Sequence, residues 1–261
     1  MRWFLLIGCC LISFRVQSQL YGPADVRAKN APAFETEQEL TRYLIEGLTD
    51  DKLKARVIAA WIVYQMQRDG YRHKELIKYS NQNRRAPEPV NNNPFQTRIG
   101  TYQDFARLFQ SMGEQAGLTV TTIQGYAGEN INTNQYREPA YQAGKILLNL
   151  WHGNTHSLQR YQASWNAVQI DGQWYLLDTY WMIANQNLFE AQTISSPKGM
   201  ELFLQRRKNT RPAKSLLTRG KQIDNRYFLA KPRFFIQTHF PLDEQWQLLP
   251  IPWTWSTFTN Q

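Results

Sequence analysis

At 261 residues the chain is long enough to bury a sizeable core, and its 13% aromatic and 20% charged residues exclude an intrinsically disordered protein. The formal net charge is +9, and most of the excess is concentrated in residues 198–226. No run of the sequence approaches the roughly 20 apolar residues that would span a bilayer.

The N-terminus has the pattern of an export signal. Arg2 gives a short positive start, an apolar run follows from Trp3 to Phe14, and Val16-Gln17-Ser18 resembles a small-x-small cleavage site. We therefore expect residues 1–18 to be a signal peptide and the mature protein to be exported, either periplasmic or secreted. Lipid anchoring at Cys9 is the alternative that we disfavour, because the apolar run before this cysteine is short.

Both cysteines of the chain, Cys9 and Cys10, lie inside this expected signal peptide. The mature protein would then have no disulfide, no thiolate metal ligand and no cysteine nucleophile. The four histidines are scattered and lack the carboxylate or cysteine spacing of a ligand set, so we expect no metal site and no cofactor.

Two helices are predicted in the first third of the chain. Apolar residues recur at helical spacing from Thr36 to Leu48. A second helix begins near Asp50, and its apolar stripe continues until Asp69-Gly70 ends it. The Asn- and Pro-rich residues 81–98 predict a loop.

Residues 98–125 predict a helix followed by a strand. Thr101 is the expected N-cap, with Asp104 three residues later, and Gly117 ends the helix. The next residues, Leu118 to Gln124, have the β-branched composition of a strand. The segment 127–160 that follows is irregular, except for a short apolar run at 146–151 that could form another strand.

The strongest local signal is SWNAVQIDGQWYLLD, residues 164–178. Two alternating strands joined by Asp171-Gly172 predict a hairpin with a two-residue type I′ turn. We expect residues 19–195 to form one domain, followed by a basic insert at 196–226 and a C-terminal extension at 227–261 that packs on the same domain.

The basic insert has nine Lys or Arg residues between Lys198 and Arg226 against two acidic residues. Around Arg206, Arg207 and Lys208 this charge could bind an anionic surface, although we favour a solvated loop that keeps the protein soluble. Few aromatic residues lie there, so base stacking is poorly supported, and we expect no nucleic-acid partner.

The order of the motifs resembles the transglutaminase-like superfamily. Gly-x-x-x-x-Phe-Ala-x-Leu-Phe at 100–109, Ile-x-Gly-Tyr at 123–126 and the Trp-Asn-Ala-Val hairpin carry this resemblance. Phe228-Leu-Ala-x-Pro and His239-Phe-Pro resemble the C-terminal part of the kyphoscoliosis-peptidase branch. The resemblance implies an α+β, papain/transglutaminase-like core, in which a central helix packs on an antiparallel sheet, with a β-rich C-terminal extension.

In that superfamily a Cys-His-Asp triad performs acyl transfer or peptide cleavage. The resemblance places the cysteine position at Tyr102, two residues after Gly100, and the histidine position at Ala163, two residues before Trp165. Asp178 matches the aspartate. Two of the three members are replaced, so the covalent route of the family is not expected here.

We therefore expect a catalytically inactive scaffold that binds a protein or peptide through a groove containing Tyr102, Trp165, Asp178 and Trp181. The alternative is a cysteine-independent peptidase or amidase that acts on peptide or isopeptide bonds with displaced catalytic groups. The candidates for such groups, which no triad spacing supports, are Thr101, Ser164, His152 and His156.

Three residues also have purely structural interpretations. Asp178 is a good turn former before Thr-Tyr-Trp. Tyr102 is expected to fill the volume of the former cleft, with its hydroxyl bonded to Asp178 or to a backbone group. His239 is predicted to be a packing or interface histidine.

Overall fold

A computed structural model describes residues 21–69, 93–128, 161–184 and 222–259. The expected signal peptide, the apolar run at 146–151, His152, His156 and most of the basic insert lie outside these residues.

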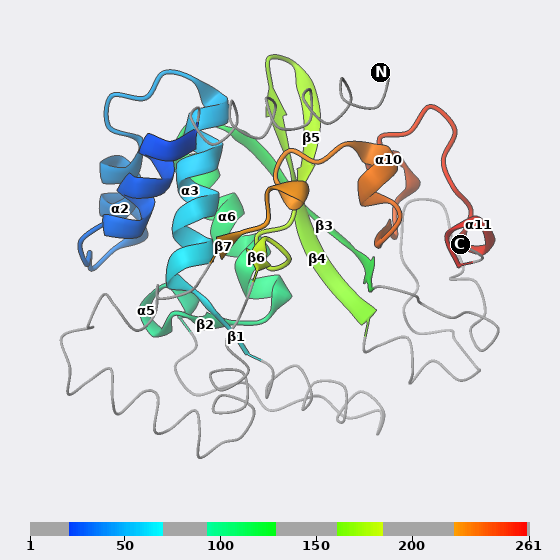
Figure 1. The fold of residues 1–261 in the computed structure, drawn as a ribbon, viewed down its shortest axis with the longest axis horizontal. Helices are drawn as coiled ribbons and strands as arrows, with labels where there is room; N and C mark the ends of the chain where they lie inside the picture. Colours follow the sequence, from blue (N-terminus) through cyan, green and yellow to red (C-terminus); the bar gives the residue numbers. More distant parts are fainter. Residues whose placement is uncertain (1–20, 70–92, 129–160, 185–221, 260–261) are drawn as a thin grey trace, which may run out of the picture.

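A four-stranded antiparallel sheet with the order β5-β4-β3-β8 forms the middle layer of the fold (Figure 1). Its strands are β3 (Thr119–Ala127), β4 (Gln162–Ile170), β5 (Gln173–Leu177) and β8 (His239–Pro241). Three helices lie on one side of it: α2 (Glu37–Ile45), α3 (Asp51–Gln65) and α6 (Tyr102–Gln115). The short helices α10 (Pro232–Phe235) and α11 (Trp255–Thr259) lie on the other side. The sheet is therefore enclosed by N-terminal helices and C-terminal segments, as expected of an α+β core.

The remaining described elements are short. Two small sheets pair β1 with β2 in parallel and β6 with β7 in antiparallel fashion. Residues 21–30 are helical and precede α2. The other elements are α5 (Pro94–Thr97), β1 (Gln67–Arg68), β2 (Ile99–Gly100), β6 (Ile183–Ala184), β7 (Gln222–Ile223), η3 (Asn225–Tyr227) and η4 (Glu244–Gln247).

The observed starts of α2 and α3 agree with the predicted starts, because a side-chain cap fixes each of them. Thr36 Oγ1 accepts a hydrogen bond from the Glu39 N–H at 3.2 Å, and Asp50 Oδ1 accepts one from the Lys52 N–H at 2.7 Å. The predicted end of α3 at Asp69-Gly70 is wrong. The helix stops at Gln65, because the next residues leave helical geometry to pair with β2.

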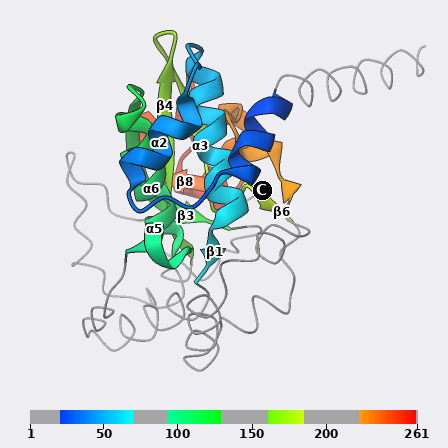
Figure 2. The ribbon, with the colours of Figure 1, turned by 90° about the vertical axis from the view of Figure 1, so that its left-hand side faces the viewer.

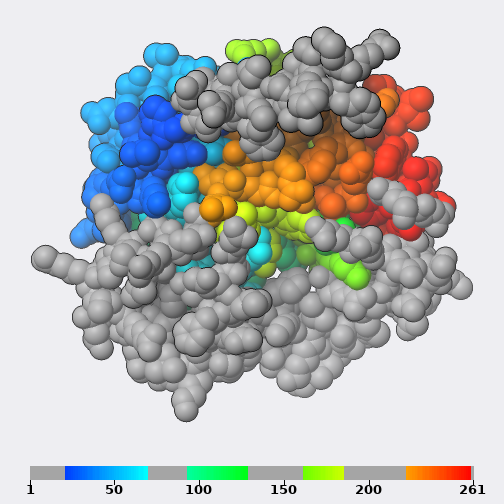
Figure 3. All heavy atoms as spheres, in the orientation of Figure 1, coloured from blue at the N-terminus to red at the C-terminus, as the bar shows by residue number. Residues whose placement is uncertain are grey.

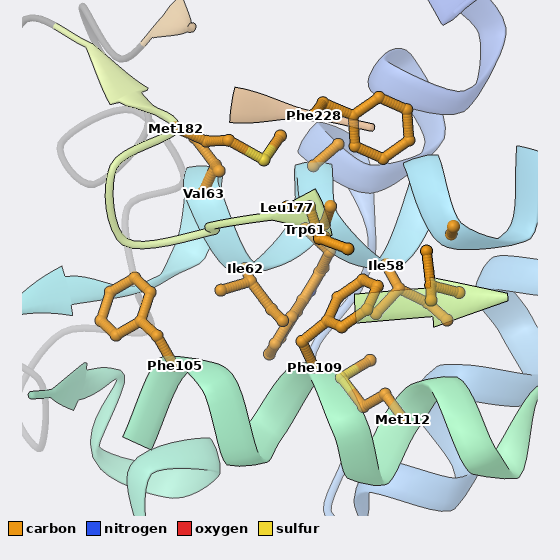
Figure 4. Close-up of a cluster of buried hydrophobic side chains, with 14 of the residues drawn as sticks. Ile58, Trp61, Ile62, Val63, Phe105, Phe109, Met112, Leu177, Met182 and Phe228 are labelled. Carbon is orange, nitrogen blue, oxygen red and sulfur yellow. The ribbon is translucent and has the colours of Figure 1, made fainter. Parts of the chain in front are cut away.

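The main core lies where α3 and α6 pack together, and Figure 2 shows these helices side by side with α2. Ile58, Trp61 and Ile62 of α3 point towards Phe109 and Met112 of α6 (Figure 4). All five side chains are at most 1% exposed. Complete burial of each such side chain stabilises the fold by about 1.5–3 kcal/mol, so this interface fixes α6 against the sheet.

The predicted hairpin is confirmed. β4 pairs with β5 from Asn166↔Leu177 to Ile170↔Gln173, which leaves Asp171 and Gly172 as the loop. Their φ angles of 51° and 77° are both positive, as a type I′ turn requires.

The C-terminal part, residues 222–259, has less strand than its expected β-rich character implied. Only β7 and β8 are strands there, and four short helices, η3, α10, η4 and α11, contain more of its residues than these strands do. Pro232 begins α10, because the first residue of a helix needs no intrahelical partner for its N–H. Pro241 ends β8, because proline lacks the N–H that a continuing strand needs. A second, smaller core is formed by Tyr126, Ile236, Phe240, Trp255 and Phe258.

A buried ion pair joins three distant segments of the chain. Arg56 is 2% exposed, and its Nε and Nη2 donate to the two carboxylate oxygens of Asp25, each at 2.7 Å. Its Nη1 donates to Asn225 Oδ1 at 2.7 Å. The guanidinium also lies 4.7 Å from the centre of the Tyr21 ring and 5.0 Å from that of the Phe228 ring. In Figure 3 the segment around η3 and α10 (orange) lies beside the N-terminal helices (blue).

Among the helices of the described ranges, none combines the length and the apolar character that a membrane crossing requires.

Candidate functional site

The start of α6 has the predicted cap. The backbone N–H and the hydroxyl of Thr101 both donate to Asp104 Oδ2, at 2.8 and 3.0 Å. The preceding Gly100 is required here, because a Cβ at this position would lie 2.7 Å from the Cβ of Asp104. Tyr102 is then the first residue of α6. The Thr101 hydroxyl is therefore part of the helix cap rather than a free nucleophile.

The phenol of Tyr102 is not an anion at neutral pH. Burial is the main cause that raises its pKa to about 12, and the neighbouring Tyr180 and Asp104 contribute to the same shift. At pH 7 only about one molecule in 10⁵ would carry a phenolate there. Asp178 is not among the groups that shift the Tyr102 pKa, and its carboxylate has other partners.

Ala163 lies in β4 opposite Gly125 of β3. Eight consecutive residue pairs fix this register, and a slip by one residue would turn every side chain of the strand to the other face. The neighbouring Ser164 is 2% exposed. At position 125 only glycine fits, because a Cβ there would overlap with the ring of Trp165 and the carbonyl oxygen of Phe240.

Asp178 follows β5 and is 1% exposed. Its Oδ1 accepts hydrogen bonds from the N–H groups of Tyr180 and Trp181, at 2.8 and 2.9 Å. The predicted turn-forming role of this aspartate is therefore confirmed. Its second oxygen, Oδ2, lies 3.1 Å from Nε2 of His239, a contact that the sequence did not predict.

His239 is enclosed by an aromatic cage. Its ring centroid lies 4.0 Å from that of Phe235, 4.8 Å from Trp181, 5.1 Å from Trp165 and 5.7 Å from Tyr227. The side chain is fully buried, which confirms the packing role predicted for it. Its Nδ1 lies 2.7 Å from the hydroxyl of Thr238.

Burial lowers the pKa of His239 below its ordinary value of 6.5. The hydrogen bond and charge of Asp178 and the carbonyl of Phe235 raise it, but burial has the larger effect. The imidazole is therefore neutral at pH 7 and has one N–H. A carboxylate accepts only, so we assign this hydrogen to Nε2, which leaves Nδ1 to accept from the Thr238 hydroxyl.

Arg68 holds the turn that follows Asp178. Its Nε donates to the Tyr180 carbonyl at 3.0 Å, and Nη2 donates to the Ile183 carbonyl at 3.1 Å. The guanidinium also lies 4.7 Å from the centre of the Tyr180 ring. Sequence analysis missed this residue, because its place depends on the pairing of β1 with β2, for which the sequence has no local signal.

Trp165, Trp181 and Asp178 meet around His239. Tyr102 lies near Tyr180 and Asp104 at the start of α6, and the Tyr180 N–H in turn donates to Asp178. Trp165 and Asp178 are each 1% exposed, so they support the site from within the core. Tyr102 and Trp181 are half-buried. Within the ranges that the structure describes, no group of three or more His, Cys, Asp or Glu residues could hold a metal ion.

Comparison with known proteins agrees with the expected family. The family model described as the transglutaminase-like superfamily matches residues 38–179, more than half of the chain. The kyphoscoliosis peptidase of Homo sapiens is 25% identical over 250 residues, which are 96% of this chain and 30% of that protein.

Two invertebrate relatives match as well. Hillarin of Drosophila melanogaster is 27% identical over 228 residues, 85% of this chain and 22% of that protein. Lim and transglutaminase domain protein ltd-1 of Caenorhabditis elegans is 25% identical over 155 residues, 59% of this chain and 16% of that protein. The chain spans less than a third of the length of these relatives. It belongs to the transglutaminase-like superfamily and resembles its kyphoscoliosis-peptidase branch.

Proposed function

We propose that this protein is an exported, non-catalytic member of the superfamily that binds an extended peptide or protein segment. The observation that carries the proposal is the pair of side chains at the two reactive positions of the family motif. These are Tyr102 at the first position of α6 and Ala163 in β4.

The tyrosine cannot replace a thiolate. A cysteine at a helix N-terminus is activated because the helix dipole lowers its pKa. At the same place burial, together with Tyr180 and Asp104, raises the pKa of Tyr102 to about 12. A phenol that remains protonated at neutral pH is a poor nucleophile.

Alanine at position 163 means that no general base stands where the family motif has its histidine. Ala163 has no titratable group, and the β3–β4 pairing fixes its position independently of α6. Asp178 retains the carboxylate, but its two oxygens bond the Tyr180 and Trp181 N–H groups and His239. The retained aspartate is therefore used in the structure without the two partners of the family reaction.

Two aromatic side chains support a role in peptide binding. Tyr102 and Trp181 are half-buried aromatic side chains, and the Trp181 N–H donates to the retained Asp178. Aromatic rings of this kind supply contact area to a partner at low entropic cost and also offer a polar atom. Export is a further part of the proposal, and N-terminal sequencing of the secreted protein should then begin at Gln19.

A turnover assay tests the loss of chemistry. Full-length wild-type protein should release no product above background from peptide p-nitroanilides, and should not incorporate a fluorescent primary amine into a glutamine peptide. In the double variant Tyr102→Cys/Ala163→His, the introduced thiol should become reactive towards iodoacetamide near neutral pH, with Tyr102→Cys alone as its control. Wild-type turnover that is lost in Asp178→Asn would contradict the proposal.

A peptide array tests the binding role. An array of 12-residue sequences is expected to reveal a preferred class of peptide for the wild-type protein. Trp181→Ala should weaken this binding at least about tenfold, equivalent to roughly 1.4 kcal/mol. Trp174→Ala is the matched control, since Trp174 is a half-buried tryptophan that packs against Trp246. Equal effects of the two variants would remove Trp181 from the proposed surface.

A further inference from the structure

A second set of polar groups, outside the two replaced positions, forms a continuous hydrogen-bonded chain. Thr238 Oγ1 lies 2.7 Å from His239 Nδ1, and His239 Nε2 lies 3.1 Å from Asp178 Oδ2. A hydroxyl, an imidazole and a carboxylate in this order are the groups that general-base activation of an alcohol requires.

The Nε2–H tautomer gives the direction of the Thr238–His239 hydrogen bond, because Nδ1 then accepts and the Thr238 hydroxyl donates. The Thr238 hydroxyl has two acceptors within reach, Nδ1 of His239 at 2.7 Å and the Phe235 carbonyl at 3.5 Å. The shorter contact is at the preferred length of a hydroxyl hydrogen bond, and the longer one is at the limit. The proton of Thr238 is therefore directed at the imidazole nitrogen that can take it.

Two neighbours of His239 partly offset the effect of burial on the charged imidazole that proton transfer would create. Asp178 lies at the opposite ring nitrogen, and its other oxygen is fixed by two backbone N–H groups, which keep the carboxylate oriented. The Phe235 carbonyl acts in the same direction, because it favours the protonated ring. The ring need not move, since its aromatic cage holds it and the hydrogen bond already exists.

Thr238 is the accessible end of this chain. It is half-buried and lies at the start of β8, whereas His239 and Asp178 are each 1% exposed. A reagent would therefore meet the hydroxyl, and the imidazole and carboxylate would act from behind it.

We propose that Thr238 is an activated hydroxyl that accepts an acyl group from an activated ester or thioester. Its Oγ1 attacks the carbonyl carbon, and its proton passes to His239 Nδ1. The bond to the leaving alcohol or thiol breaks, and the leaving group takes that proton. The product is an O-acyl threonine, and Asp178 is a positioning residue for the imidazole. This reaction uses none of the positions at which the family motif has its cysteine and histidine.

Acylation by p-nitrophenyl acetate tests the proposal. The full-length protein is treated at pH 7.5, and the adducts are located by peptide mass spectrometry. Thr97 is the internal control, because it is also half-buried and its hydroxyl donates to the Asn93 carbonyl at 3.1 Å. General-base assistance contributes about 10²–10⁴-fold, so Thr238 should react at least about 100 times faster than Thr97.

Substitutions distinguish an activated hydroxyl from mere exposure. Thr238→Val should abolish the adduct and Thr238→Ser should retain it, with both variants checked for unchanged thermal unfolding. In Asp178→Asn the rate should fall, and the midpoint of its pH profile should shift, which a loss of packing alone would not cause. A Thr238 rate within about threefold of Thr97, no adduct at Thr238, or equal labelling in His239→Gln would each overturn the proposal. If the acyl-threonine is hydrolysed after it forms, ester turnover should depend on Thr238. Peptidase turnover that persists in Thr238→Val would contradict the proposed non-catalytic function, but not the proposal for Thr238.

Discussion

The start of α6 and the aromatic cage around His239 differ in how their polar groups are used. At the start of α6, Tyr102 is a half-buried phenol beside Tyr180 and Asp104. In the cage, Asp178 and His239 are fully buried and directly bonded. A retained catalytic aspartate is therefore not evidence of retained catalysis, because its carboxylate also serves a buried structural pair. Loss of the cysteine and histidine could leave that pair intact.

The largest loss of stability should come from a substitution in β3, the strand that supports the aromatic cage. Gly125→Val places a side chain against the ring of Trp165 and the Phe240 backbone, and backbone is not free to move aside. We expect a loss of at least about 3 kcal/mol of unfolding free energy, or failure to fold. Gly22→Ala is the control, since no atom lies within 4 Å of a Cβ there. Similar urea midpoints for the two variants would show that the cage tolerates displacement.

Replacement of the His239 imidazole should lower the free energy of unfolding somewhat less than Gly125→Val does. His239→Leu retains much of the apolar volume but takes the Nε2 donor away from a buried carboxylate, and we expect a loss of about 2–4 kcal/mol. Urea unfolding of His239→Leu, Asp178→Asn and the double variant measures the coupling between the two residues. Strictly additive losses would mean that the 3.1 Å contact contributes nothing beyond packing.

The cage should also make stability depend on pH in a specific direction. The pKa of His239 is lowered on folding, so the unfolded chain binds its proton first, near pH 6.5. The contribution of the neutral imidazole is complete above that pH and declines as the pH falls from 6.5 towards the folded-state pKa. Its slope is at most about 1.4 kcal/mol per pH unit. Melting curves between pH 7.5 and 5 should show this decline, and His239→Gln should flatten it.

The smallest effect is expected at the start of α6. Tyr102→Phe keeps the ring and removes only the hydroxyl, so the free energy of unfolding should change by about 1 kcal/mol or less. A loss above about 2 kcal/mol in chemical denaturation would show that the hydroxyl is as important to the structure as the buried pair.

Local chemistry accounts for what could be predicted from the sequence. The Asp171-Gly172 turn and the Thr101–Asp104 cap depend on residues at most three positions apart, and both were predicted correctly. The end of α3 was missed because it depends on β2, more than 30 residues later in the chain. The bond of Asp178 to His239 spans 61 residues. No periodicity encodes such a pairing, and only the His-Phe-Pro motif marked His239 for attention.

The order of the strands has a consequence for how the chain folds. In the described part of the sheet, β3 is an interior strand because β8, more than 110 residues later in the sequence, covers its outer edge at Gly125–Ala127. The bond between Arg56 and Asn225 closes a loop of 169 residues. Contacts this distant form late, since the entropy of closing the loop is lost before the contact is gained. During synthesis, β3 would expose a free edge to other nascent chains until His239–Pro241 arrives, and it is in this interval that aggregation competes most directly with folding.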